Sequence, residues 1–128
     1  MLADRVEYSS GKEAAKVLDD GVARYCTFSS YVHEGAHVDA LCLGCLFTDI
    51  EWYWGLFNCA NFIECRFVRC TFRGTSFADT KFVECAFDSC NFLPDNLGAS
   101  CVNDGSKIYG GSVSECSGGE FLFGQGAF

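Results

Sequence analysis

An aromatic or aliphatic residue returns at every fifth position from Phe47 onward, and this period limits what the chain can fold into. Five residues advance about 500° around an α-helix, and an odd step along a β-strand reverses the face on which a side chain lies. Neither regular structure keeps such side chains on one side, so the chain must turn a corner within each repeat. The recurring residues are Phe47, Trp52, Phe57, Phe62, Phe67, Phe72, Phe77, Phe82, Phe87, Phe92, Leu97 and Val102.

A small residue precedes most of these positions by two. We therefore expect a large and a small side chain to point inward together in each repeat, and the other three residues to point outward. The small residues are Cys45, Gly55, Ala60, Cys65, Cys70, Thr75, Thr80, Cys85, Cys90 and Ser100.

A longer period of 20 residues gives the number of repeats in one coil. The segment IECRFVRCTF (63–72) matches VECAFDSCNF (83–92) in Glu, Cys, Phe, Cys and Phe. Four repeats therefore make one coil, and equivalent residues stack about 4.8 Å apart, at the spacing of adjacent strands. A weaker run extends the pattern toward the N-terminus, with one step of four residues between Leu43 and Phe47. Its central positions are Leu43, Val38, His33 and Phe28, and its small positions are Leu41, Ala36, Tyr31 and Cys26.

The run CRFVRCTFRGTSFADTKFVECAFDSCNF resembles the pentapeptide-repeat family, whose pattern is a small residue, any residue and a central Leu or Phe. The resemblance implies an all-β fold, a right-handed quadrilateral parallel β-helix. It covers residues 26–102, which corresponds to about four coils and a rod about 20 Å long.

The two ends differ from the repeats. Ser10-Gly11-Lys12-Glu13 fits a capping box, which predicts a short helix to about Asp19 within an N-terminal capping segment, residues 1–25. The Gly-rich residues 103–128 are expected to cap the other end, because an open coil exposes unpaired strand edges and apolar side chains. A homodimer through the C-terminal end is the alternative. The whole chain is expected to form one globular domain.

Composition and charge indicate the cellular compartment of the protein and the kind of partner that it binds. Thirteen phenylalanines supply a core without cross-links, so the ten cysteines are expected to act as small hydrophobes in a reducing cytoplasm. The first residues contain no apolar leader, and no 18-residue uncharged run occurs, so we expect neither a signal peptide nor a membrane span. A net charge of −8 disfavours direct nucleic acid binding and favours a basic protein partner.

Two motifs suggest metal or redox chemistry. His33-Glu34-Gly35-Ala36-His37 spells the HExxH motif of zinc proteases, but Gly35 and the neighbouring valines oppose the helix that such a site needs. Cys42-Leu43-Gly44-Cys45 is a CxxC without a second pair, and Cys45 is already an inward position. We therefore predict no metal site, no cofactor and no catalytic residue, and the chain is not expected to be an enzyme.

The outward residues offer two candidate partner-binding groups. Glu64, Glu84 and Asp104 are predicted to stack as an acidic ladder beside the apolar pair Ile63 and Val83. Stacked like charges are destabilising, so the ladder suggests a binding strip for a basic partner, although a solvated face is the simpler alternative.

Tyr53 and Trp54 form the second group. Exposed aromatic residues of these types are common anchors in protein interfaces. Packing against the N-terminal helix explains them equally well.

A rod without a catalytic constellation is expected to be a binding module. The family resemblance implies two roles: a small cytoplasmic immunity protein that neutralises a cognate toxin, such as a nuclease effector of a bacterial secretion system, or a DNA mimic that binds a topoisomerase such as DNA gyrase. We favour the immunity role because the chain is compact and acidic and would suit the basic active site of a nuclease. A scaffold without an inhibitory role is the third alternative.

Overall fold

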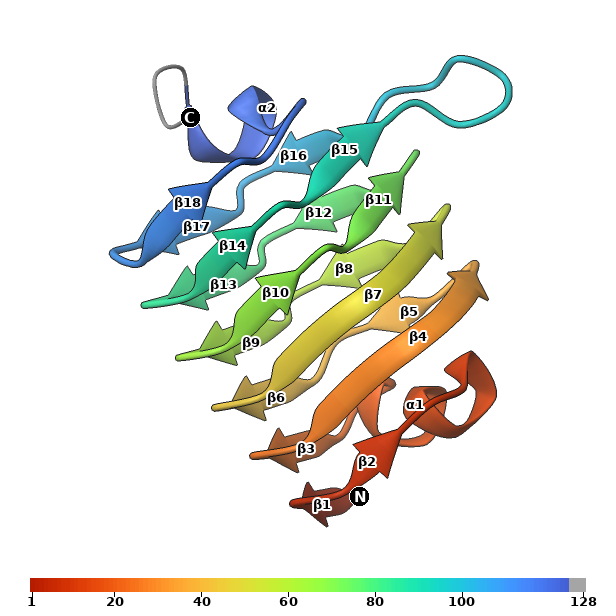
Figure 1. Cartoon of the computed structure of the whole chain (residues 1–128), viewed down its shortest axis with the longest axis vertical. Helices are drawn as coiled ribbons and strands as arrows, with labels where there is room; N and C mark the ends of the chain where they lie inside the picture. Colours follow the sequence, from red (N-terminus) through yellow and green to blue (C-terminus); the bar gives the residue numbers. More distant parts are fainter. Residues whose placement is uncertain (125–128) are drawn as a thin grey trace.

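The computed structural model describes residues 1–124 and is a parallel β-solenoid of about five turns (Figure 1). The central coils have four sides, and strands stack on the equivalent strands of neighbouring coils. The predicted all-β, quadrilateral parallel β-helix with a short N-terminal helix and a C-terminal cap is confirmed.

Three parallel sheets form the four sides. Sheet A contains β1 (Leu2–Asp4), β3 (Val22–Arg24), β6 (Leu41–Leu43), β9 (Asn61–Ile63), β13 (Lys81–Val83) and β17 (Lys107–Tyr109). Sheet B covers two sides, because its long strands run through a corner; it contains β2 (Glu7–Tyr8), β4 (Thr27–Glu34), β7 (Leu46–Tyr53), β10 (Arg66–Val68), β11 (Thr71–Arg73), β14 (Ala86–Asp88), β15 (Asn91–Leu93) and β18 (Ser112–Ser114). Sheet C contains β5 (His37–Val38), β8 (Leu56–Asn58), β12 (Ser76–Ala78) and β16 (Val102–Asp104).

Aromatic rings fill the centre of the solenoid in columns. The rings within a column are nearly parallel because equivalent residues of successive coils lie directly above one another. Burial of each large apolar side chain contributes roughly 1.5–3 kcal/mol to folding. The longest column has ring-centroid distances between 4.7 and 4.9 Å and consists of Tyr8, Phe28, Phe47, Phe67 and Phe87.

The cysteines pack beside these columns as free thiols, and eight of the ten are buried. Five of them, Cys26, Cys65, Cys70, Cys85 and Cys90, make the same hydrogen bond: the thiol donates to the backbone carbonyl 23 residues earlier, as from Cys65 to Cys42 at 3.4 Å and from Cys85 to Phe62 at 3.3 Å. The inward thiols therefore have the packing role that the sequence predicted for small residues.

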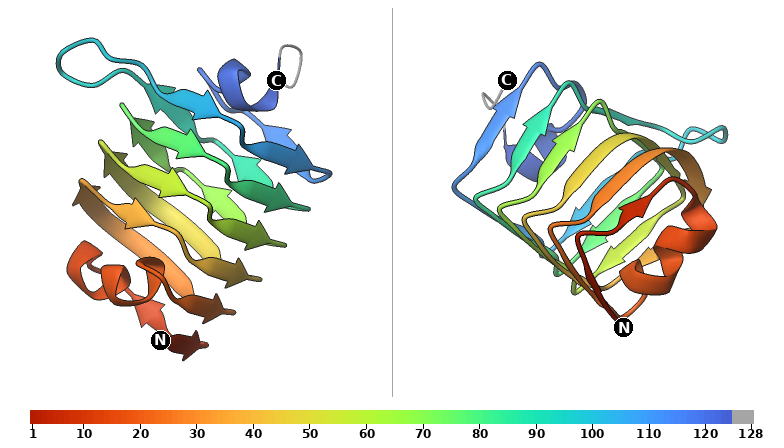
Figure 2. Two further views of the ribbon diagram at one scale, coloured as in Figure 1. Left: turned by 180° about the vertical axis from the view of Figure 1, so that it is seen from behind. Right: turned by 60° about the horizontal axis from the view of Figure 1, so that its bottom comes forward.

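The helix α1 (Gly11–Leu18) lies within the first coil and covers part of its end (Figure 2). The Ser10 side chain accepts a hydrogen bond from the Glu13 backbone N–H, as the predicted capping box requires. The helix packs against β3, β4 and β5, where a third and a fourth strand would otherwise lie. Strands β1 and β2 pair in register with β3 and β4.

The coils therefore extend toward the N-terminus beyond the predicted limit at residue 26. The aromatic period did not reveal the first coil because Ala3 takes its inward position on sheet A, Tyr8 is its one aromatic central residue, and α1 takes the place of its other two repeats.

A six-residue insertion shifts the repeat after β15. Leu56 pairs with Ser76 at an offset of 20, whereas Ser76 pairs with Val102 at an offset of 26. The predicted central residues Leu97 and Val102 are therefore wrong: they are 85% and 50% exposed, and Cys101 takes the inward position. The coils continue through β18, past the predicted limit at residue 102.

The helix α2 (Glu120–Phe123) covers the C-terminal end of the aromatic columns. Phe121 packs edge-on against Phe92 at 5.5 Å between ring centroids, and Phe123 lies 4.8 Å from Phe87. These contacts shield the last rings from water.

The register break near Leu43 differs in detail from the prediction. Cys42 is fully buried at the central position, and Ala40 is the small residue before it, whereas Leu41 is 39% exposed. The four-residue step lies between Val38 and Cys42, because Val22 pairs with Leu41 at an offset of 19. Leu43 is thus an outward residue.

Candidate protein-binding surface

The outer side of sheet A carries a row of apolar side chains at the ends of successive strands. Strand register places Leu43, Ile63, Val83 and Tyr109 directly above one another. The first three are half-buried and Tyr109 is 50% exposed. Because neighbouring strands are about 4.8 Å apart, these side chains form a continuous apolar ridge.

Glu64 and Glu84 follow this ridge at the corner of the coil. Both have left-handed backbone conformations, with φ of 53° and 51°, a region that favours glycine. Glycine does occupy the same corner in the flanking coils, at Gly44 and Gly110. The fold therefore does not require side chains here, and two stacked carboxylates add like-charge repulsion.

We call the ridge and these two glutamates the sheet-A strip; it consists of Leu43, Ile63, Glu64, Val83, Glu84 and Tyr109. The Glu84 carboxylate lies over Gly110 and accepts a hydrogen bond from the Gly111 backbone N–H at 3.3 Å. Within residues 1–124, the Glu64 carboxylate has no hydrogen-bond or ion-pair partner. Glu64 is therefore available to a binding partner.

Positive charges lie on the other side of the ridge. Lys81 and Lys107 begin β13 and β17, and register stacks one on the other. The surface of sheet A thus presents an acidic edge, an apolar centre and a basic edge across one sheet. A complementary partner would carry the opposite order of charges.

Asp104 does not belong to the predicted acidic ladder. It lies at the end of β16 in sheet C, where it pairs with Ala78. The six-residue insertion causes this difference, because it places Gly110 instead of Asp104 above Glu84. Only Glu64 and Glu84 stack.

Tyr53 and Trp54 hold the loop of residues 94–100, which contains the insertion. The Trp54 indole N–H donates to the Asp95 carboxylate at 2.9 Å, and the Asn96 backbone N–H donates to the Tyr53 hydroxyl at 2.8 Å. Hydrogen bonds from the Ala99 backbone and from Trp54 lower the pKa of Asp95. These aromatic residues therefore contact the loop, and Trp54 is still 41% exposed. Their part in partner binding stays a prediction.

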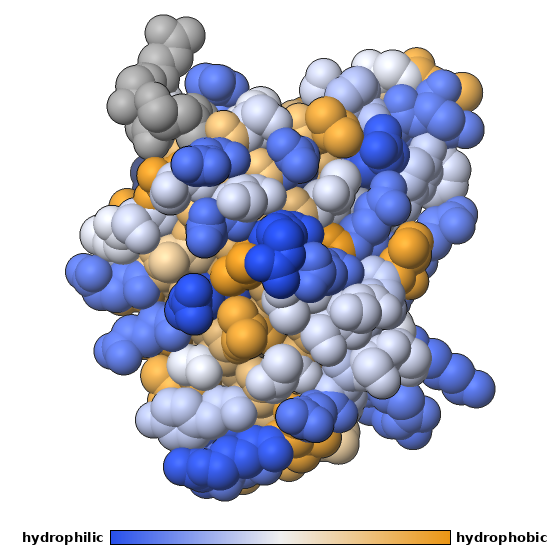
Figure 3. All heavy atoms as spheres, in the orientation of Figure 1, coloured by the Kyte–Doolittle hydropathy of each residue, from blue (hydrophilic) through white to orange (hydrophobic). Residues whose placement is uncertain are grey.

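The side of the molecule formed by sheet B has a different character. Hydrophilic and hydrophobic residues alternate over it without one broad patch of either kind (Figure 3). A hollow of about 370 Å³ lies beside Tyr31 and Val32, and its rim carries the Arg69 and Asp49 ion pair at 2.8 Å. The guanidinium lowers the pKa of Asp49. Such an exposed pair contributes little to stability, so this side offers weaker recognition chemistry than the sheet-A strip.

The HEGAH segment forms strands instead of a helix. His33 lies in β4 and His37 in β5, with Gly35 in a left-handed turn between them. His33 is the central residue of its repeat and pairs with Trp52, as predicted. The two imidazoles therefore lack the helical arrangement of the zinc-protease motif.

His33 is expected to make folding sensitive to acid. Burial lowers the pKa of His33 below its usual 6.5, and its Nδ1 atom has no hydrogen-bond partner among the described residues. The unfolded chain therefore binds a proton more readily than the folded chain, so His33 lowers stability as pH falls from about 6.5 toward the folded pKa.

Measurement of the free energy of unfolding from pH 7.5 to 5 tests this prediction. The variant His33→Leu should show a smaller loss of stability over the acid part of this range. Equal slopes for the two proteins would contradict the assignment.

Comparison with known families identifies the repeat. A family model described as pentapeptide repeats matches residues 56–92 in eight copies, whereas a comparison with curated proteins found no match. No helix within residues 1–124 is long and apolar enough to cross a membrane. Pentapeptide-repeat solenoids are scaffolds that often bind proteins. The match and the stacked four-sided coils agree: the segment of residues 56–92 consists of the repeats that define the pentapeptide-repeat family.

Proposed function

We propose that this chain is a cytoplasmic immunity protein, without enzymatic activity, that binds and neutralises a basic toxin through the sheet-A strip. The observation that carries this proposal is the pair Glu64 and Glu84 beside the apolar ridge, in a corner where the flanking coils have glycine. Like charges at stacked positions are unfavourable in general, and the fold does not require them at this corner, which favours a role in recognition.

The chemistry of the strip suits a protein partner. Apolar side chains at the centre of an interface supply affinity, and charges at its edge steer the approach and select the partner. The net charge of −8 favours a basic toxin, such as a nuclease effector of a bacterial secretion system, and disfavours direct nucleic acid binding. No membrane role is proposed.

The second candidate is a DNA mimic that binds a topoisomerase such as DNA gyrase. The observation that favours it is the acidic, rod-shaped solenoid. About five turns at the strand spacing of about 4.8 Å give a rod about 24 Å long. This length covers only a short stretch of a DNA-binding groove, so we rank this function second.

A homodimer through the C-terminal end ranks lower still. The apolar rings at that end already pack against Phe121 and Phe123. A dimer there would have less apolar area to bury.

Affinity capture from the native cell lysate tests the proposed function. The tagged chain is expected to recover a basic protein in equal amount, and addition of the chain to that protein should inhibit its toxic activity. Recovery of a topoisomerase, with inhibition of its supercoiling, would favour the second candidate.

A further inference from the structure

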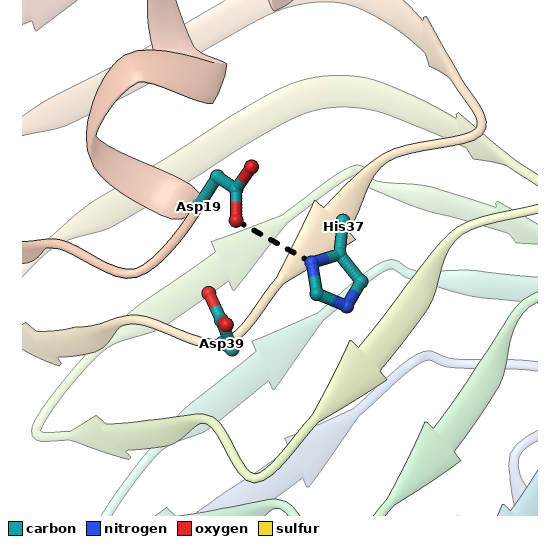
Figure 4. Close-up of side chains that lie close together, drawn as sticks. All are labelled: Asp19, His37 and Asp39. Carbon is teal, nitrogen blue, oxygen red and sulfur yellow. Dashed lines mark hydrogen bonds and ion pairs between the residues drawn. The ribbon is translucent and has the colours of Figure 1, made fainter.

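Three side chains that can bind metal converge beside the C-terminal end of α1. They are Asp19, directly after the helix, His37 in β5, and Asp39, directly after β5 (Figure 4). One ligand atom from each lies within 4.8 Å of the others, and His37 Nδ1 is 3.4 Å from the nearer Asp19 oxygen. The cluster joins the helix of the first coil to a strand of the second coil.

Backbone hydrogen bonds fix the two aspartates. The Asp19 N–H donates to the Ala15 carbonyl and the Asp39 N–H donates to the Leu18 carbonyl, each at 3.1 Å. The Asp39 carboxylate also accepts a hydrogen bond from the Asp20 backbone N–H. The backbone of both aspartates and the carboxylate of Asp39 are therefore held before any ligand binds, which lowers the entropic cost of binding.

The cluster concentrates negative charge that a bound cation would neutralise. Asp19, Asp20 and Asp39 lie where the helix dipole is already negative, and acidic groups are unfavourable at a helix C-terminus. Within the part of the chain that the structure describes, no lysine or arginine forms an ion pair with them; the only such contact is from His37. A bound cation would offset this concentration of negative charge.

The donor set indicates which cation fits. An imidazole nitrogen favours zinc and other transition metals, whereas calcium and magnesium prefer oxygen alone. We propose that Asp19, His37 and Asp39 bind one divalent transition-metal ion such as Zn²⁺, with water in the remaining coordination positions. The ion links α1 to the second coil. This is a different site from the zinc-protease motif, because it uses His37 with two aspartates and does not use His33.

Titration with Zn²⁺ and Co²⁺ alone tests the proposal on the reduced, full-length chain. We expect one ion per chain, a rise in Tm with metal concentration, and a Co²⁺ absorption spectrum typical of nitrogen and oxygen ligands. His37→Ala and Asp19→Asn should each weaken binding by about tenfold or more. These residues are exposed, so both variants should still fold.

The control is His33→Leu, which should bind Zn²⁺ like the wild type. Equal affinity in wild type and His37→Ala would overturn the proposal. A sulfur-to-cobalt charge-transfer band would also overturn it, because it would assign the ion to the thiols.

Discussion

Replacing Phe67 by alanine is expected to lower the free energy of unfolding by about 3–5 kcal/mol. The side chain is fully buried and stacks on Phe47 and Phe87 at 4.8 and 4.7 Å between ring centroids. It also meets Phe62 edge-on at 5.3 Å. Truncation removes these contacts and leaves a cavity between coils that cannot collapse, because the strands above and below are fixed by their hydrogen bonds.

Denaturant unfolding of the wild type, Phe67→Ala and Phe67→Leu measures this effect. Leucine fits the central position of the repeat pattern, so Phe67→Leu should cost clearly less than the alanine variant. A loss below about 1 kcal/mol for Phe67→Ala would show that the column is not the main source of stability.

The double variant Ile63→Ser with Val83→Ser is expected to weaken partner binding by about 30-fold or more. These side chains form the centre of the apolar ridge, where an interface residue that matters contributes about 2 kcal/mol or more. Both point outward, so the fold should be little affected. Titration of the captured partner with purified variants gives the change in Kd.

A matched control comes from sheet C. Leu56→Ser with Val102→Ser removes two apolar side chains that are 39% and 50% exposed on another side of the solenoid. This variant should bind like the wild type. Equal weakening by both double variants would indicate a general effect on the solenoid, and the strip would no longer be the binding surface.

The sequence predicts the central part of the fold well because every repeat has the same inward pair, one large and one small side chain. The aromatic period from Phe47 to Phe92 holds in the structure without exception. The N-terminal coil was missed because Ala3 gives no aromatic signal, Tyr8 is an isolated aromatic residue, and α1 replaces two strands there. The helix α1 has the length of two repeats, so β1 still pairs with β3 at an offset of 20. The helix itself carries no five-residue pattern, so the sequence does not reveal this offset.

The candidate site was predictable only where the period is regular. Ile63, Val83, Glu64 and Glu84 align as expected because nothing interrupts residues 56–92. The loop of residues 94–100 displaces everything after it, which moved Asp104 to another side. Pro94 and Gly98 could have indicated that loop from the sequence, because such residues interrupt strands.

Contacts between residues far apart in the chain could not be predicted from the sequence. The hydrogen bond between Trp54 and Asp95 joins residues 41 positions apart across the inserted loop. The Asp19, His37 and Asp39 cluster likewise depends on where α1 ends against β5. Periodicity places residues within coils, but it does not place an insertion or a helix against them.

The most direct test of the proposed function compares capture of the basic partner by three tagged proteins: the wild type, Glu64→Lys with Glu84→Lys, and Asp79→Lys with Asp104→Lys. Both double variants change the net charge by the same amount, but the second pair lies on sheet C, where Asp79 directly follows β12 and Asp104 ends β16. We predict that the wild type and the Asp79 and Asp104 variant recover the partner and neutralise it, whereas the Glu64 and Glu84 variant recovers none. Equal recovery by all three proteins would contradict recognition through the sheet-A strip.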